Sequence, residues 1–179
     1  MTQTARTYGA ALYELARDEG LSDDVFAQLQ MAAGLLRENP DYMRLLSLPS
    51  VPKRERCAAL DESFGGKVHE YLLSVMKLLV ERGGIGELYG CEETFRRRYY
   101  EDHGILEVTA AAAAPLPNKQ MEKLERKLAE KTGKKIRLTV RVDPSVLGGV
   151  RLEYAGKRLD GTVRRRLEEI SSRLRETTL

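Results

Sequence analysis

The chain has 179 residues, 42% of them hydrophobic and 32% charged, a balance that is typical of a folded globular protein and excludes a disordered one. Its net charge of +3 is unevenly distributed, because residues 1–104 carry 13 basic and 17 acidic side chains whereas residues 105–179 carry 17 and 10. This shift predicts two domains with different partners. No apolar run approaches the roughly 20 residues that span a bilayer, and the N-terminus lacks a signal-peptide pattern, so neither a membrane-spanning nor a secreted protein is expected.

The first hundred residues are predicted to form short helices, most of them closed by glycine or proline. Pro52 marks a helix start, and the pair Gly65–Gly66 marks a helix end. No segment here alternates with period two, so residues 1–104 are predicted to form a bundle of six helices. The expected helices cover residues 6–20, 21–40, 40–50, 52–66, 67–84 and 87–104.

After Gly104 the pattern changes to a mixture of strands and helices. A strand is expected from Ile105 into an Ala/Pro-rich connection, and residues 118–133 are expected to be helical. Apolar and polar residues alternate over 136–142 and again over 150–154, which predicts two strands. The order β-α-β-β-α predicts a small sheet with helices on its apolar face, and an α+β fold class overall. The last helix places four apolar residues on one stripe: Val163, Leu167, Ile170 and Leu174.

The region from Asp143 to Ile170 combines glycines with arginines, which raises the possibility of a phosphate site. A phosphate loop needs its glycines to lead into a helix N-terminus, whereas Gly148 and Gly149 precede a predicted strand. Gly156 lies in a hairpin-like turn, and Gly161 in a turn before the last helix. Turns or bulges are therefore the expected role of these glycines.

The sequence offers no recognisable catalytic or metal site. His69 and His103 are expected at opposite ends of helices and lie in no metal-ligand spacing. Cys57 and Cys91 form no C-x-x-C motif, so reduced thiols are expected, with a disulfide or a redox switch as the alternative. No nucleophile motif is present either, so the residues by themselves offer no site for catalysis.

The first and fifth predicted helices have wider apolar arcs than packing in a bundle requires. On a wheel of about 100° per residue, the polar residues of the first helix fill about 100° and the apolar residues about 200°. In the fifth helix the polar residues form one stripe: Glu70, Ser74, Lys77 and Glu81. Two interpretations stay open. Either both helices are buried on most sides, or part of their surface is a groove for a partner's amphipathic helix.

Three stretches resemble one protein family: ARTYGAALYELA at 5–16, LLVERGGIGEL at 78–88 and DPSVLGGVRLEYAGKRLDGTVRRRLEEI at 143–170. They are similar to the delta subunit of bacterial F-type ATP synthase, whose mitochondrial relative is the oligomycin-sensitivity-conferring protein. The likeness covers the whole chain in the right order. The last stretch is the most specific, because it joins Asp-Pro-Ser, two glycines before a strand and Asp-Gly-Thr-Val before an Arg-rich helix.

The resemblance implies a stator that links the catalytic head to the peripheral stalk, so that rotor torque is resisted during proton-driven ATP synthesis. It implies that residues 1–104 bind the N-terminal helix of an alpha subunit and that residues 105–179 bind the C-terminal region of the b subunits. It implies no cofactor and no nucleic acid, and a place at the cytoplasmic face of the bacterial plasma membrane, held through the complex without insertion. Carried over by position, the residues that face the alpha helix are Tyr8, Ala11, Leu12, Leu15, Leu78, Leu79 and Arg82.

The alternative is a helical RNA-binding regulator, supported only by the basic C-terminal region. Salt separates the two functions, because nucleic-acid affinity falls steeply as salt rises. A helix held in a groove by apolar burial should respond little to salt. The predicted strands also lack the alternating aromatic residues that an RNA-binding sheet uses for stacking.

Overall fold

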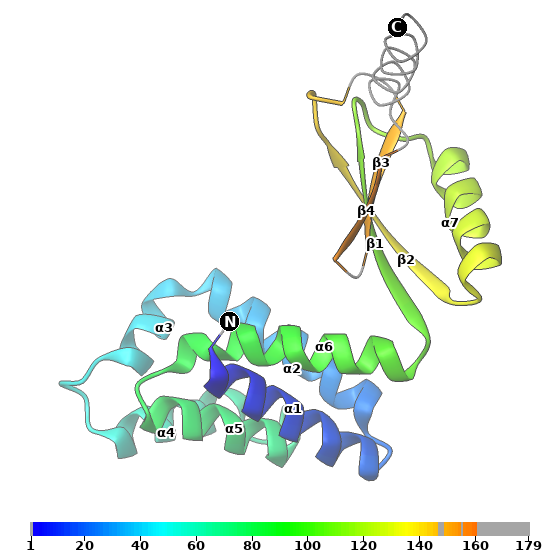
Figure 1. Ribbon diagram of the computed structural model, residues 1–179. Coiled ribbons are helices and arrows are strands. Elements are labelled where there is room, and N and C mark those ends of the chain that lie inside the picture. The colour runs from blue at the N-terminus through cyan, green and yellow to red at the C-terminus, as the bar shows by residue number, and fades with distance from the viewer. Residues whose placement is uncertain (1, 147–148, 155, 161–179) are drawn as a thin grey trace, which may run out of the picture. The chain divides into compact units, whose positions relative to one another are not determined.

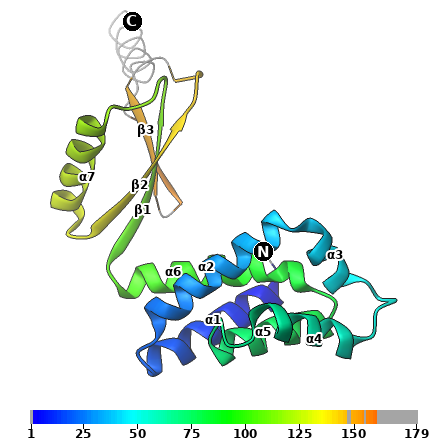
Figure 2. The ribbon, with the colours of Figure 1, turned by 180° about the vertical axis from the view of Figure 1, so that it is seen from behind.

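The computed structural model describes residues 2–146, 149–154 and 156–160, and the predicted α+β class is confirmed. The chain divides into two compact units that meet between Tyr99 and Tyr100. This division falls inside the sixth helix, a few residues before the boundary at Gly104 that the sequence suggested. Figures 1 and 2 show the helical unit and the sheet-containing unit from opposite sides.

The helical unit consists of six helices and one short 3-10 turn (Figure 1). Pro40 begins the third helix, and glycines with positive φ at positions 20, 66 and 83 follow the first, fourth and fifth helices. These residue types favour helix starts and ends, so the helix boundaries could be predicted from the sequence. The elements are α1 (Gln3–Asp18), α2 (Ser22–Glu38), α3 (Pro40–Ser47), α4 (Lys53–Phe64), α5 (Glu70–Glu81), η1 (Ile85–Glu87) and α6 (Leu88–Asp102).

An aromatic cluster joins three of these helices in the core. The Phe95 ring of α6 meets the Tyr13 ring of α1 edge-on, with centroids 5.1 Å apart, and stacks on the Phe26 ring of α2 at 5.7 Å. Phe26 also contacts Tyr99 at 4.7 Å. Such ring pairs stabilise by about 0.5–1.5 kcal/mol each beyond their burial. The cluster therefore anchors α1 and α2 to α6.

Gly9 lets α1 approach α6 closely. A Cβ atom at this position would lie 2.6 Å from the backbone oxygen of Cys91 and 2.9 Å from the Cβ of Thr94. Such distances are too short for a side chain, so the contact requires glycine. The small residues noted in the first helix thus serve, at Gly9, packing within the chain.

The second unit contains a four-stranded sheet with the order β2-β1-β3-β4. Strand β1 pairs with β2 in parallel through the crossover helix α7, and with β3 in antiparallel fashion, and β3 pairs antiparallel with β4. Helix α7 lies along one side of the sheet and packs on β2 (Figures 1 and 2). The elements are β1 (Ile105–Ala112), α7 (Asn118–Thr132), β2 (Lys135–Val142), β3 (Val150–Tyr154) and β4 (Lys157–Asp160).

Strand β4 corrects the predicted order of elements. The sequence predicted a turn and then a helix directly after the strand at 150–154, and no further strand. Strand β4 has only four residues, and its one apolar residue, Leu159, is 52% exposed, so it shows no alternation that periodicity could detect. The predicted last helix, with Val163 and Leu167, lies outside the described residues. So do Gly148 and Gly161. Gly149 (φ 80°) and Gly156 (φ 73°) lie in the left-handed region, which confirms the turn interpretation for these two.

Candidate partner-binding site

Helices α1 and α5 pack side by side, and contacts at both ends show that they run in opposite directions. At one end the Arg82 guanidinium lies 5.5 Å from the centre of the Tyr8 ring, a cation–π contact. At the other end the Tyr71 hydroxyl donates a hydrogen bond to the carboxylate of Glu19. These two contacts join the ends of both helices, and the residues predicted to face a partner lie at the first contact or between the two.

Exposed apolar side chains lie on α1 and α5 between the two contacts. Leu15 is 47% exposed and Leu78 is 40% exposed, and Ala11 is exposed one turn before Leu15. Tyr8, Ala11 and Leu15 follow each other at intervals of three and four residues, so they form one stripe along α1. Tyr8, Ala11, Leu15, Leu78 and Arg82 are called the α1–α5 surface below.

The glycine turn that ends α5 places Arg82 at the edge of this surface. Gly83 takes a φ of 71° and ends α5, and the Gly84 N–H donates to the carbonyl oxygen of Leu79 at 2.8 Å. Arg82 is therefore the C-cap residue directly after Glu81, where a cation interacts favourably with the C-terminal end of the helix dipole.

Leu12 and Leu79 lie beneath the surface instead of on it. Both are 0% exposed, so neither side chain is available to a partner while the bundle is intact. The wheel could not separate them from Leu15 and Leu78, because all four are apolar and only the packing of neighbouring helices decides which are covered. The interpretation as bundle core thus holds for Leu12 and Leu79, whereas an adjacent apolar strip with Leu15 and Leu78 is exposed, and its use as a groove for a partner helix stays a prediction.

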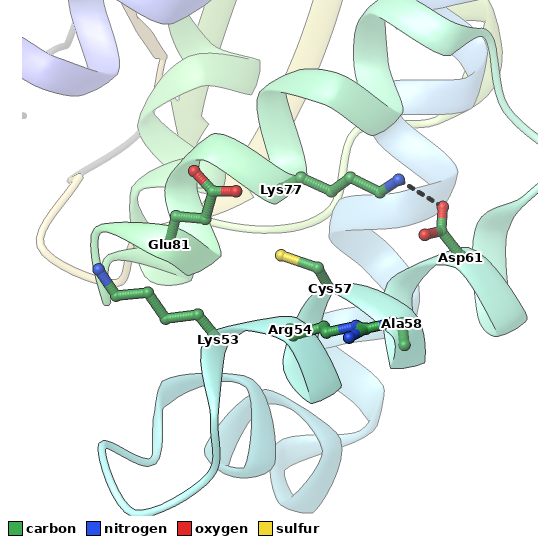
Figure 3. Close-up of a pocket in the computed structure, with 7 residues that line it drawn as sticks. All are labelled: Lys53, Arg54, Cys57, Ala58, Asp61, Lys77 and Glu81. Atoms are coloured by element: carbon green, nitrogen blue, oxygen red, sulfur yellow. Dashed lines mark ion pairs between the residues drawn. The ribbon is translucent and has the colours of Figure 1, made fainter.

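A cavity of about 540 Å³ lies on the other side of α5, against α4. Sequence reasoning missed it, because most of its lining residues are polar and they come from two helices. Figure 3 shows Cys57 reaching towards α5 between Glu81 and the ion pair of Lys77 with Asp61, whose charged atoms are 2.6 Å apart. Burial, followed by the charge of Glu81, raises the pKa of the Cys57 thiol, which keeps it protonated and a poor nucleophile.

The two cysteines and the two histidines are not part of a metal-binding cluster in the described part of the chain. Both cysteines are free, and burial raises the pKa of Cys91 to about 12. His69 caps α5, its Nδ1 accepting from the Tyr71 N–H at 3.4 Å, and His103 is exposed. Across the described ranges there is no cluster of three or more His, Cys, Asp or Glu residues that could hold a metal ion. Nor is any helix there long and apolar enough to cross a membrane.

In the second unit, Asp143 organises the turn that follows β2. Its carboxylate accepts from the hydroxyl of Ser145 at 2.6 Å and from the Ser145 N–H at 3.0 Å, and it pairs with Arg151 at 2.7 Å. The hydrogen bonds from Ser145, together with Arg151, lower the pKa of Asp143 to about 2. The Asp-Pro-Ser segment is therefore a charged turn that ties β2 to β3.

An exposed apolar strip on one of two compact units is typical of a protein that binds other proteins. Residues 4–174 match the model of the family described as ATP synthase delta (OSCP) subunit. A Lactobacillus gasseri protein named ATP synthase subunit delta is 33% identical over 175 residues, covering 97% of this chain and 96% of the relative. A Clostridium kluyveri protein of the same name is 27% identical over 165 residues, covering 92% and 91%.

A chain in the Toxoplasma gondii mitochondrial ATP synthase hexamer shares the fold, with a TM-score of 0.75 at 18% identity, covering 97% of this chain and 98% of that one. The chain belongs to the ATP synthase delta (OSCP) subunit family. The predicted class, a peripheral stalk subunit of F-type ATP synthase, is thereby confirmed, and the comparisons give no support to an RNA-binding regulator.

Proposed function

We propose that the α1–α5 surface binds the amphipathic N-terminal helix of an alpha subunit and so attaches this chain to the catalytic head. The observation that carries the proposal is the exposure of Leu15 and Leu78, at 47% and 40%, between two polar contacts that fix the helices. An amphipathic helix laid along the pair would cover both leucines. Arg82 would remain at the rim, where a charge selects the orientation of the partner more than it adds affinity.

The second unit completes the stator by binding the C-terminal region of the b subunits. Its support is the charge of residues 105–179, which carry 17 basic and 10 acidic side chains and so differ sharply from the acidic helical region. In this arrangement the chain breaks no bond and transmits mechanical load between head and stalk. It is peripheral to the cytoplasmic face of the bacterial plasma membrane, and is held there by its partner subunits.

Substitution of Ala11 by Asp tests the head contact. Ala11 is exposed in the helical unit, so the new carboxylate stays hydrated in the free protein and should change the free energy of unfolding by about 1 kcal/mol or less. In the complex the carboxylate would be buried without a partner, and affinity for a synthetic alpha N-terminal peptide should fall by about a hundredfold or more. Calorimetric titration and a thermal melt of each variant measure the two effects.

Ala27→Asp is the matched control, since Ala27 is likewise exposed but lies on α2. It should bind the peptide as the wild type does. Unchanged peptide affinity of Ala11→Asp, together with an unchanged melt, would show that this strip is not the binding site. A large fall in melting temperature would instead place Ala11 in the bundle core. Repeating the titration at raised salt should change the wild-type affinity little.

A further inference from the structure

The outward-facing side of β2 carries a row of cations: Lys135, Arg137 and Arg141. All three are exposed, and the fourth outward position, Thr139, is neutral. The alternate residues Ile136, Leu138 and Val140 are half-buried on the side where α7 packs. The row therefore takes no part in holding α7 to the sheet. It is called the basic row below.

The strand register shows which carboxylates share the face of this row. Arg137 is in register with Glu107 on β1, and Arg141 with Ala111, so these residues share one face of the sheet. Asp143 lies 4.0 Å from Arg141, but it is already bonded to Arg151 at 2.7 Å and to Ser145. The Arg141 side chain is 66% exposed. A third carboxylate on this face, Glu153, is in register with Thr109 on β1 and pairs with Arg151 at 3.6 Å and with Arg158 at 3.9 Å. The three cations thus face one carboxylate in register on the neighbouring strand, and the other two carboxylates are engaged by different arginines.

The dimensions of the row fit a helix better than a single charged group. Lys135 and Arg141 are six residues apart on an extended strand, a distance of about 20 Å. An α-helix covers that length in about 13 residues, close to four turns, so acidic residues on one of its faces could meet all three cations. Arginine favours such contacts because its planar guanidinium pairs with carboxylates through two parallel hydrogen bonds.

The chemistry of this face does not favour nucleic acid. Single-stranded RNA is bound on sheets by exposed aromatic rings that stack on bases. The aromatic residue beside the row is Tyr100, which is only 6% exposed, and the Arg137 guanidinium lies 5.8 Å from the centre of its ring. The ring therefore supports the arginine and is not free for a base.

We propose that the basic row binds an acidic, carboxylate-bearing face of a helix in the b subunit. This inference rests on the proposed function, in which the second unit binds the stalk, and it names the surface and the chemistry of that contact. Exposed cations at an interface mainly raise the association rate and make the affinity depend on salt. Binding should therefore weaken as ionic strength rises, in contrast to the apolar contact on α1 and α5.

The test measures affinity for the purified C-terminal segment of the b subunit from the same ATP synthase, with the full-length chain. The charge reversal Arg137→Glu/Arg141→Glu should weaken binding about tenfold or more at about 50 mM salt, and less at about 200 mM. Arg137→Ala/Arg141→Ala should have a smaller effect in the same direction, and it keeps the test valid if reversed charges disturb the sheet. A melt of each variant reports folding.

The control Lys127→Glu/Lys131→Glu makes the same change in net charge on exposed positions of α7. It should bind within about twofold of the wild type, because a long-range charge effect alone is small at these salt concentrations. If both charge reversals lowered the affinity for the b segment equally, or if neither lowered it, the proposed role of the basic row would be wrong, while the stalk contact would stand. Absence of wild-type binding to the b segment would overturn the stalk contact itself. A mixed-sequence oligoribonucleotide serves as a second probe. If Arg137→Glu/Arg141→Glu lost binding to this oligoribonucleotide but bound the b segment as the wild type does, the row would be assigned to nucleic acid.

Discussion

At the scale of single residues, Asp143 shows how one side chain links the sequence motif to a stable turn. Its carboxylate accepts two hydrogen bonds from Ser145 and pairs with Arg151. All of these contacts favour the ionised form, so the pKa falls from an ordinary 3.8 to about 2. The family resemblance found at Asp-Pro-Ser therefore has a physical basis in a charged turn.

This pKa predicts a contribution to stability that depends on pH. Because the folded-state pKa is lowered, the contribution is complete above about pH 4 and is lost as the pH falls towards 2. Asp143→Asn keeps an oxygen that can accept from Ser145 but cannot ionise, so its stability should change less than that of the wild type over this range. Thermal melts at several pH values measure the difference. Parallel pH profiles for the two proteins would contradict the assignment.

At the scale of elements, Arg56 joins three helices through its buried guanidinium. The side chain is 5% exposed, and it donates to the carbonyl oxygens of Leu46 and Val80 at 3.0 and 3.1 Å and to that of Val51 at 3.1 Å. Leu46 and Val80 lie in the last turns of α3 and α5, where carbonyl groups lack partners within the helix. Arg56 thus ties α4 to both helix ends, one of which carries Arg82.

Arg56→Met should therefore destabilise the helical unit by about 2–4 kcal/mol, because methionine fills much of the volume but leaves three carbonyl groups without their charged donor. Chemical denaturation measures this free energy of unfolding. Arg54→Met, two residues earlier on an exposed part of α4, should change it by about 0.5 kcal/mol or less. Similar losses in both variants would show that the buried hydrogen bonds are not the cause.

The elements also show what could be predicted from the sequence and what could not. Helix ends were readable because glycine and proline act locally, as Gly83 and Pro52 do. The alternation of residues 136–142 was likewise local, and it placed Arg137 and Arg141 correctly on the outward side of β2. The separation of Leu78 from Leu79 was not readable, because it depends on neighbouring helices that are distant in sequence. The cavity beside Cys57 and the triple contact of Arg56 are also tertiary.

At the scale of the whole molecule, the two compact units predict that the helical unit folds without the second one. The fragment 1–104 retains all of α6, which ends at Asp102, and the turn at Gly104 (φ 62°) that follows it. It therefore keeps Phe95 and the aromatic cluster, with the close contact of Gly9 on α6. A fragment cut at Tyr99, where the two units meet, would instead lose the last turn of the helix.

The fragment 1–104 should melt in one cooperative transition and bind the alpha N-terminal peptide with wild-type affinity, because every residue of the α1–α5 surface is present. The matched control is fragment 1–87, which lacks α6. This fragment lacks Leu88, Cys91 and Phe95, all 0% exposed in the full chain. It also exposes the side of α1 on which Gly9 packs closely against α6. Loss of that much core exceeds the marginal stability of a small domain, so this fragment should show no cooperative transition. Circular dichroism melts and peptide titration distinguish the outcomes. A non-cooperative melt of 1–104 would mean that the helical unit depends on the second unit for its stability.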